Sequence, residues 1–499
     1  MTAPATLRGF AIAATAAVLA ACAVGPDYRA PEAPATGSYT EKPQPERTES
    51  APVQGGDAQR FEVGAKISAD WWTLFGSPEL DALIRTALAG QPTLAAAQAA
   101  LRQAEENVNA HYAVLYPSVD ASLSARRQRI SGASLGNPSL SVSPFNLYNA
   151  SVNVSYAIDV AGGARRELEA LQAGVDFQRL QVEATYLALT ANVATTAFRE
   201  ASLREQIRAT REISEAQDAQ LQLAEKQFKL GAISGSDLLG QRAQAAQTRA
   251  TLPPLEKALA QTRNQLAVLV GKLPADAKLP QLDFSAFKLP QELPLSVPSE
   301  LLKQRPDVRQ AEAIMRQTNA RIGVAEALMF PQLTLTGSYG SAATRSGNLF
   351  DPGTQLWNIG ANLLQPIFHA GQLRAQKRGA EAAYDQAFAQ YRLAVLTAFQ
   401  DVADVLLALE YDATTLKAQA EAEAAARESL EVTQQQLKFG AVNYVQLFNA
   451  QRQYSLAKFA LVQAQAARYA DTAALFQALG GGWWNRVDQA NTASVKVAN

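Results

Sequence analysis

The sequence predicts a mixed α/β membrane protein that is mainly helical and is built from two tandem copies of one unit. Three observations lead to this fold class: an internal repeat along the 499 residues, short segments in which apolar and polar residues alternate, and long proline-free stretches with apolar residues in heptads. The alternation is typical of β-strands, and the heptads are typical of coiled-coil helices. Each copy should therefore contain a strand hairpin and a long helical hairpin.

The repeat becomes visible when the segment that begins at Gln91 is aligned with the one that begins at Arg305, an offset of 214 residues. Four pairs coincide without a gap: Pro92/Pro306, Arg102/Arg316, Gln103/Gln317 and Pro117/Pro331. Farther along, the offset is 209 and pairs Gly162 with Gly371 and Gly231 with Gly440. Because such a long period fixes the architecture, we expect a first repeat at 77–273 and a second at 301–482. A Pro-rich extended linker, 274–300, joins them, and a tail follows at 483–499.

The strands are expected directly after Pro117 and Pro331. Apolar Val119, Ala121 and Leu123 alternate with polar Ser118, Asp120 and Ser122, and a second alternating segment follows in each copy. We predict strand hairpins within 117–160 and 331–368. Strands of about ten residues with aromatic ends suit an outer-membrane barrel, whose minimum is about eight strands. Four strands cannot close such a barrel, so several chains would have to share it; a soluble sandwich hairpin is the alternative.

Two helical hairpins of unusual length are expected at 163–270 and 371–479. Apolar residues recur at alternating steps of three and four, and no proline interrupts 164–252. The run from Ala164 to Lys229 alone would make a rod of about 100 Å. The core positions of a soluble bundle would give the same pattern. Each hairpin has a tight reversal, with Gly231 or Gly440 just past the first helix and Ser234, Ser236 or Asn443 available to cap the second.

The chain begins with a signal that explains its single cysteine. Arg8, an apolar stretch and the small residues Ala20 and Ala21 form a secretory signal peptide over 1–21. The sequence "LAAC" resembles the bacterial lipobox, which implies that Cys22 becomes the lipidated N-terminus of the segment 22–76. The absence of Asp after the cysteine implies, by the same resemblance, sorting to the outer membrane. The alternative is a small buried hydrophobe.

Composition excludes several function classes. Lys and Arg number 45 against 46 Asp and Glu, so the net charge is −1 and nucleic-acid binding is not expected. With two histidines and one cysteine, neither a metal site nor a Cys/His catalytic pair can be assembled from the usual ligands. We expect no enzyme activity, no catalytic residues and no cofactor other than the lipid on Cys22.

The order of these features resembles the TolC-like outer membrane factor family, in the lipoprotein branch that serves resistance-nodulation-division efflux pumps. The resemblance extends from Cys22 to Trp484 and rests on the segments "CAVGPDY", "WWTLFGSPELDALIRTAL", "SYAIDVAGGARR", "RPDVRQAEAIMRQTNARIGVAEALMFPQL", "QPIFHAGQLRAQ" and "FQALGGGW". It implies a homotrimer with a twelve-stranded barrel in the outer membrane, four strands per chain, continued by a periplasmic α-helical barrel. The implied function is passive conduction of drugs or other toxic small molecules. The implied partners are a periplasmic adaptor, an inner-membrane pump and outer-membrane lipid.

The resemblance also implies two functional regions in the helical part. The adaptor would dock at the hairpin tips, at Lys229, Gly231, Ala232, Lys438, Gly440 and Ala441. A periplasmic gate would lie just past the second tip, where the family pattern Asp-Ala-Gln-Arg stands here as Asn449 to Arg452. Neutral amides would then replace an anionic ring, and closure would rest on hydrogen bonds and on Arg452, paired with Asp237.

Other functions remain open at this point. The outlet of a type I protein secretion system would use the same fold, and a lipid-anchored coiled-coil scaffold without a pore would use the same helices. A periplasmic enzyme would need an acid, base or metal constellation that the sequence does not show. The cargo, the particular pump and the particular adaptor do not follow from the sequence.

Overall fold

The computed structural model describes residues 23–131, 133, 136–137, 139 and 143–486. The signal peptide 1–21, the candidate lipidation residue Cys22 and all of the tail beyond residue 486 lie outside this range. None of the helices in the described part combines the length and the apolar content needed to cross a membrane.

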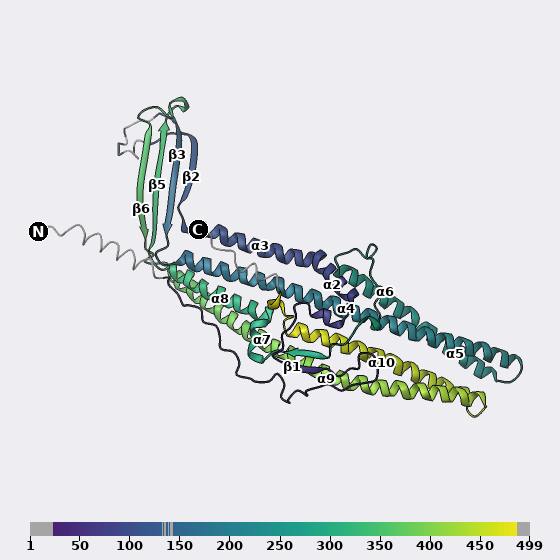
Figure 1. The fold of residues 1–499 in the computed structure, drawn as a ribbon. Helices are drawn as coiled ribbons and strands as arrows, with labels where there is room; N and C mark the ends of the chain where they lie inside the picture. Colours follow the sequence, from purple (N-terminus) through teal and green to yellow (C-terminus); the bar gives the residue numbers. More distant parts are fainter. Residues whose placement is uncertain (1–22, 132, 134–135, 138, 140–142, 487–499) are drawn as a thin grey trace. The chain divides into compact units, whose positions relative to one another are not determined.

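The helices are the dominant elements, and four long strands accompany them (Figure 1). The α-helices are α2 (Pro78–Gly90), α3 (Pro92–Tyr112), α4 (Gly163–Lys229), α5 (Gly235–Ala250), α6 (Leu252–Leu269), α7 (Pro298–Gln304), α8 (Pro306–Ala327), α9 (Gln372–Lys438) and α10 (Tyr444–Ala478). The strands are β1 (Arg60–Val63), β2 (Ser118–Gln128), β3 (Phe145–Ile158), β4 (Glu292–Leu295), β5 (Gln332–Ala343) and β6 (Gln355–Leu364). Short 3₁₀ turns are η1 (Trp71–Phe75), η2 (Ala113–Leu115), η4 (Phe284–Ala286), η5 (Ser346–Asn348) and η6 (Trp483–Asn485).

The chain forms two compact units, and each takes segments from both sequence repeats. The first comprises residues up to 31, 99–179 and 310–392; the second comprises 32–98, 180–309 and the residues from 393 onward. A repeat is therefore not a separate compact unit. The reason is that the strands of the two copies pair with one another.

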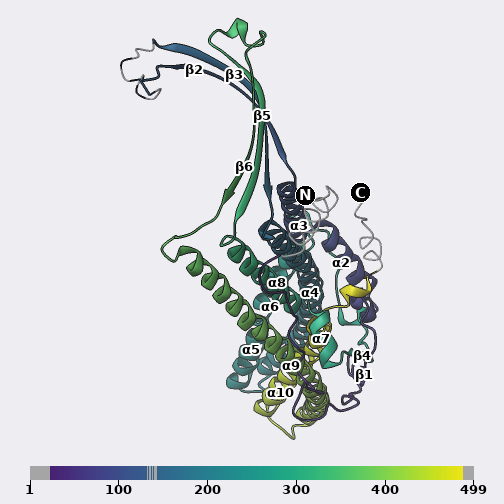
Figure 2. The ribbon, with the colours of Figure 1, turned by 90° about the vertical axis from the view of Figure 1, so that its left-hand side faces the viewer.

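The first unit contains a four-stranded antiparallel sheet in the order β2-β3-β5-β6. The two predicted hairpins are confirmed, and the β3–β5 ladder joins them. Beyond this ladder the β2–β3 hairpin bends away from β5 and β6 toward its loop (Figure 2). In the described part of the chain no strand pairs with the outer edges of β2 and β6.

The register sorts the side chains of this sheet into two faces. Val119, Val154 and Ile359 share one cross-strand row with Gly337, and the adjacent row is Ala121, Val152, Tyr339 and Trp357. The opposite face carries the row Asp120, Asn153, Ser338 and Asn358. Trp357 and Ile359 are 71% and 83% exposed, so the apolar face is uncovered in a single chain. The predicted period of two thus gives one apolar and one polar face.

The second unit has an aromatic core against which the Pro-rich stretch 274–300 packs. Trp71 is fully buried and stacks on Phe476 of α10 at 5.3 Å between ring centroids. Phe287, from the stretch 274–300, meets Phe198 of α4 edge to face at 5.0 Å. Strand β4 in the same stretch pairs in parallel with β1. This stretch is therefore packed against the helices through its own apolar side chains as well as connecting the repeats.

Two buried arginines hold helix ends and loops together in this unit. Arg305, next to α8, donates to the carbonyl of Ala478 at 3.1 Å and pairs with Asp401 of α9 at 2.7 Å. A cation at the carbonyl end of α10 is also favoured by the helix dipole. Arg468 of α10 is fully buried and donates to the carbonyls of Leu409 at 3.1 Å and Asp57 at 3.0 Å.

Arg468 of α10 interacts with Asp412 of α9, and Asp412 also lies against Asp471 of α10. Burial, and then hydrogen bonding to Asp471, raises the pKa of Asp412 to about 7, while burial lowers the pKa of Arg468 to about 10. A carboxyl whose pKa is raised in the folded state binds more protons folded than unfolded between the two pKa values. Stability therefore falls as pH rises from the unfolded value toward 7 and is constant above it.

We expect Asp412→Asn to raise the melting temperature at pH 8 and to lose this advantage at pH 4 and below, because the amide removes the ionisation. Thermal unfolding monitored by circular dichroism between pH 4 and 8 measures the effect. Asp404→Asn, at an exposed position of α9, is the matched control and should show no such trend. An Asp412→Asn protein with the wild-type pH profile would show that folding does not raise the pKa of Asp412.

Candidate functional site

The tips of the two helical hairpins have the same backbone geometry. Gly231 and Gly440 adopt φ angles of 74° and 71°, in the left-handed region that glycine adopts without strain. After α4, the Ala232 amide donates to the Gln227 carbonyl at 2.8 Å, and after α9 the Ala441 amide donates to the corresponding carbonyl at 2.9 Å. These bonds define a Schellman motif at both ends. The predicted tip glycines therefore have the expected structural role.

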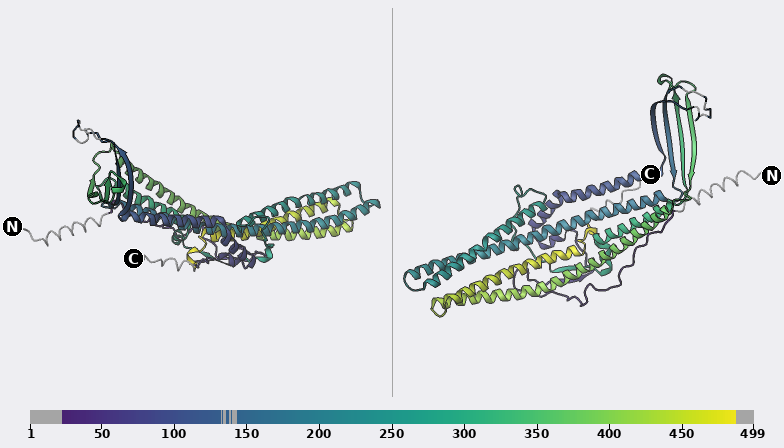
Figure 3. Two further views of the ribbon diagram at one scale, coloured as in Figure 1. Left: turned by 90° about the horizontal axis from the view of Figure 1, so that it is seen from above. Right: turned by 180° about the vertical axis from the view of Figure 1, so that it is seen from behind.

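The return helices begin with capping boxes. The Ser234 hydroxyl accepts from the Asp237 amide, and the Asp237 carboxylate accepts from the Ser234 amide. At the second tip, Asn443 and Gln446 form the equivalent box. Of the two predicted serine caps, Ser234 is the one used. Both reversals satisfy their backbone groups locally, and Figure 3 shows them at the ends of the hairpins α4–α5 and α9–α10.

Each tip presents an apolar side chain that the sequence analysis missed. Leu230 and Phe439, at equivalent positions just before the glycines, are 84% and 87% exposed. Lys229 and Lys438 end the preceding helices beside them. The only sequence signal was the shared pattern Lys-apolar-Gly. A single exposed apolar side chain is common on protein surfaces, but here one recurs beside a cation at the equivalent position of both tips.

The candidate gate residues lie on the first turns of α10 and at the start of α5. Asn449 and Arg452 are exposed, whereas Ala450 and Gln451 between them are buried. The Asp237 carboxylate is engaged in the α5 capping box. Within the described residues of one chain, no ion pair joins Asp237 to Arg452. Their pairing stays a prediction, and the structure leaves Asn449 and Arg452 on the surface of α10.

A layer of glutamine amides joins the two hairpins at the level of the candidate gate residues. The Gln220 side-chain oxygen on α4 accepts from Gln451 of α10 at 2.5 Å and from Gln241 of α5 at 3.4 Å. Gln241 and Gln451 are almost fully buried. Hydrogen bonds between neutral groups contribute about 0.5–1.5 kcal/mol each, so this layer orients the helices without locking them. Sequence reasoning missed it because glutamine is common on both faces of these helices.

An aromatic contact supports the same region. Phe448 of α10 lies against Gly240 of α5, where an added Cβ would meet the Phe448 ring at 2.9 Å. One turn nearer the tip, the Tyr444 hydroxyl donates to Gln227 of α4 at 2.8 Å. Gly240 thus permits a close approach of α5 and α10. The candidate gate residues Asn449 and Arg452 lie on α10, just after Phe448.

The polar face of the sheet is lined by small hydroxyl and amide side chains. Ser122 and Ser151 are hydrogen-bonded across β2 and β3 at 2.9 Å, and Asn153 donates to Ser122 at 3.3 Å. Such side chains bind water readily and carry little charge. This face can therefore line a hydrated path, while the opposite face suits a hydrocarbon environment.

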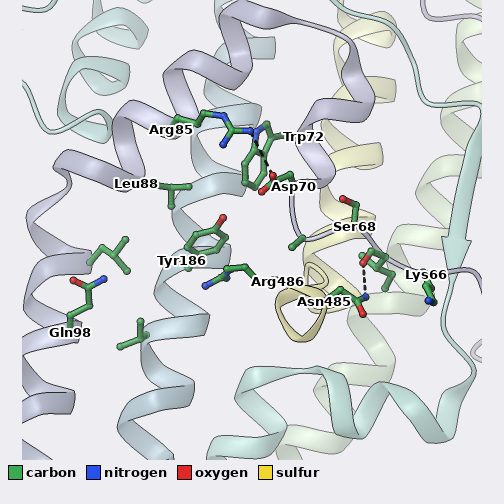
Figure 4. Close-up of a pocket in the computed structure, with 14 residues that line it drawn as sticks. Lys66, Ser68, Asp70, Trp72, Arg85, Leu88, Gln98, Tyr186, Asn485 and Arg486 are labelled. Carbon is green, nitrogen blue, oxygen red and sulfur yellow. Dashed lines mark hydrogen bonds and ion pairs between the residues drawn. The ribbon is translucent and has the colours of Figure 1, made fainter. Parts of the chain in front are cut away.

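The second unit also contains a cavity of about 860 Å³, bounded by η1, α2, α4 and the described end of the chain (Figure 4). Its arginines already have carboxylate partners. Arg486 pairs with Glu183 at 2.9 Å and lies over the Tyr186 ring at 3.9 Å, and Arg85 pairs with Asp81 at 2.9 Å. The charged residues that line the cavity therefore hold the described end of the chain against α4. In the described part of the chain, no group of three His, Cys, Asp or Glu side chains could hold a metal ion.

Comparison with known proteins agrees with this geometry. The family model "Outer membrane efflux protein" matches residues 83–272 and 297–481. The chain belongs to this family. It is therefore an outer membrane efflux protein, and it is a channel.

Individual relatives cover nearly the whole chain. The antibiotic efflux pump outer membrane protein ArpC of Pseudomonas putida is 30% identical over 97% of this chain and 98% of its own. The pyoverdine export outer membrane protein OpmQ of Pseudomonas aeruginosa is 33% identical over 83% of this chain and 87% of its own. The open-state structure of the MtrE outer membrane channel of Neisseria gonorrhoeae superposes with a TM-score of 0.78 at 26% identity, covering 92% of this chain and 98% of that one.

We expect Gly240→Val to weaken the contact between the hairpins by about 1–3 kcal/mol, because the new side chain must displace Phe448. Thermal unfolding and protease resistance of the purified protein measure the loss. Gly379→Val is the matched control, since Gly379 lies in α9 with nothing within 4 Å of its Cβ position. Equal stability of the two variants would argue against a close approach at Gly240.

Proposed function

We propose that three copies of this chain close a twelve-stranded barrel in the outer membrane, and that their helical hairpins continue it as a periplasmic channel. A periplasmic adaptor and an inner-membrane pump would deliver drugs or other toxic small molecules to this conduit. The observation that carries the proposal is the sheet of the first unit, which has one apolar face, one polar face and two edges that no strand among the described residues pairs with.

The edges favour closure with other copies of the chain. Strands β2 and β6 run in opposite directions, because the four strands alternate and β2 and β6 are the first and the fourth. The β6 edge of one copy can therefore pair with the β2 edge of the next in an antiparallel ladder. In hydrocarbon, each unpaired backbone group costs several kcal/mol, so a sheet in the membrane has to close.

Barrel width favours three copies over two. Two chains would give eight strands, and an eight-stranded barrel has an interior that side chains fill. Three chains give twelve strands and a wider, polar-lined interior. A drug-sized molecule needs this wider lumen. The names of ArpC and OpmQ connect those relatives with antibiotic efflux and pyoverdine export, which supports small-molecule cargo here.

The lipid on Cys22 is part of the proposal. The lipobox at the end of the signal peptide supports it, as does the name of another relative, the probable outer membrane lipoprotein SilC of Salmonella typhimurium. Several acyl chains, at about 0.8 kcal/mol per buried methylene group, would hold the N-terminus stably at the membrane.

The proposed conduit is tested by reconstituting the purified protein in planar lipid bilayers and measuring its molar mass in detergent. We expect the mass of a trimer and discrete single-channel currents. A trimer without conductance would support the coiled-coil scaffold instead, and a dimer would exclude the twelve-stranded barrel.

For adaptor docking, we expect Ala232→Glu and Ala441→Glu to abolish drug resistance while leaving the trimer in the membrane. Both alanines are exposed at the tips, and a carboxylate there would oppose an apolar contact that includes Leu230 and Phe439. Minimum inhibitory concentrations in a strain lacking its own channel measure the effect. Ala275→Glu, at an exposed position between the repeats, should keep full resistance; full resistance in the tip variants would place docking elsewhere.

For the gate, we expect Arg452→Ala to raise single-channel conductance and to sensitise cells to large antibiotics. Asn449→Asp should add block by divalent cations without opening the pore, since three carboxylates would form an anionic ring. An exposed ion pair contributes only about 0.2–1 kcal/mol, so an adaptor could release such contacts. Arg392→Ala, exposed on α9, is the control. Unchanged conductance of the Arg452→Ala trimer would place the constriction elsewhere.

A further inference from the structure

Residues Ala23 to Asp27 directly follow Cys22 and are held in the first unit by contacts with other segments. The residues that hold them, which together form the seat of the segment, are Ala161, Gly162, Arg166 and Gly323. The Val24 amide donates to the Ala161 carbonyl, just past the end of β3, at 3.0 Å. Arg166, in the first turn of α4, donates through Nε to the Val24 carbonyl at 3.1 Å and through Nη2 to the Gly25 carbonyl at 3.3 Å. Its Nη2 also meets the Asp27 carboxylate at 2.9 Å. One guanidinium thus contacts three residues of the segment, Val24, Gly25 and Asp27.

The position of Arg166 makes these contacts strong. Its side chain is only 8% exposed, and its Nη1 pairs with Glu169 at 2.8 Å. A buried guanidinium is stable only if its donors are satisfied. Three of its contacts are made by the N-terminal segment, so the segment completes the environment of this charge.

The backbone of the segment approaches its neighbours more closely than side chains would allow. A Cβ on Gly25, whose φ is 98°, would meet the Gly323 backbone of α8 at 2.5 Å. A Cβ on Gly162 would meet Ala23 at 2.6 Å. The seat therefore depends on glycines in three separate stretches of the sequence, which fixes the register of the segment.

In the described part of the chain, the positions related to this seat by the repeat do not form a second one. At the offsets of the repeat, Arg166 corresponds to Ala375 and Gly323 corresponds to Asn109. Gly371, the counterpart of Gly162, has nothing within 4 Å of its Cβ position. The repeat unit itself thus does not require this arginine or this glycine; both occur where an N-terminal segment is present to be held.

We propose that Arg166 is a positioning residue for the lipid anchor: it clamps residues 23–27 so that the acylated Cys22 is held at the periplasmic end of strand β3. The inference rests on the proposed lipidation of Cys22. Consecutive Cα atoms are about 3.8 Å apart, so fixing Ala23 fixes the attachment point of the lipid within one residue. The lipid and the membrane-facing strands then belong to one rigid unit, and the anchor presents the sheet at the correct depth for insertion and closure.

The test compares assembly with and without the lipid. Arg166→Met removes the donors while keeping side-chain length, Arg166→Lys keeps only a point charge, and Asp27→Asn weakens one contact at a residue that is 91% exposed. Arg179→Met is the matched control, because Arg179 lies on the same helix, is 56% exposed and pairs with Asp176 of that helix. Each substitution is made in the lipidated chain and in a chain whose residues 1–22 are replaced by a secretory signal cleaved before Ala23.

Pulse-labelled cells report the rate at which heat-resistant trimers form, and radioactive palmitate reports lipidation. In the lipidated chain we expect Arg166→Met to slow trimer formation at least threefold, Arg166→Lys and Asp27→Asn to slow it less, and Arg179→Met to leave it unchanged, all with normal palmitate incorporation. In the chain without lipid, Arg166→Met should cause no further slowing. Equal slowing in both chains would show that Arg166 merely supports the fold, and no slowing in either would also overturn the proposal. Absence of palmitate on the wild-type chain would instead refute the lipidation itself.

Discussion

The main structural constraint in this protein is that, within the described residues, the outer backbone edges of β2 and β6 pair with no other strand. A four-stranded sheet with an apolar face suits hydrocarbon, but its edge amides and carbonyls cannot remain unpaired there. Each chain carries only half of the minimum number of strands for a barrel, so the proposed function requires other copies. The alternation of serine, asparagine and glycine on the opposite face then has a clear use, because the shared lumen can stay hydrated.

The helical hairpins meet a different requirement, since they must hold a long channel together and still open. Their reversals are rigid, with a Schellman motif and a capping box at both tips. The contacts just behind the tips are softer: the Gln220 layer consists of neutral amides, and Gly240 accepts the Phe448 ring. The return helix of the first hairpin is also broken at Thr251, before Pro253 and Pro254, whereas α10 is continuous. Tips with satisfied backbone groups, on helices joined by neutral hydrogen bonds, are suited to an opening driven by a docked partner.

Local patterns predicted the local structure well. The period of two after Pro117 and Pro331 located all four long strands, and Gly231 and Gly440 located both tips, because these features depend on neighbouring residues. Contacts between distant segments could not be predicted in this way. The β3–β5 ladder, the buried Arg305 and Arg468, and the packing of Phe287 against Phe198 each join parts of the chain that no periodicity relates.

In the candidate site, too, local features were predictable and contacts between distant segments were not. The caps and turn glycines were predictable from their residue types, whereas Gln220, Leu230 and Phe439 emerged only from burial and exposure. The position of the gate was expected from a resemblance, and the pairing of Arg452 with Asp237 was inferred from the neutral residue at 449. Within one chain Asp237 completes the α5 cap. Arg166 was part of a quoted motif, but only the contacts with residues 23–27 give it a role.

Cross-linking of the strand edges tests the central claim most directly. Ser122 of β2 and Asn358 or Asn362 of β6 lie on the polar face, and the only native cysteine is the one proposed to be lipidated. Variants that carry Ser122→Cys together with Asn358→Cys or Asn362→Cys should, on oxidation in outer membranes, form covalent dimers and trimers in at least one of the two pairs. Each single variant should remain monomeric on a denaturing gel. Monomers alone in both double variants, at normal expression, would contradict a barrel closed between β2 and β6 of neighbouring copies.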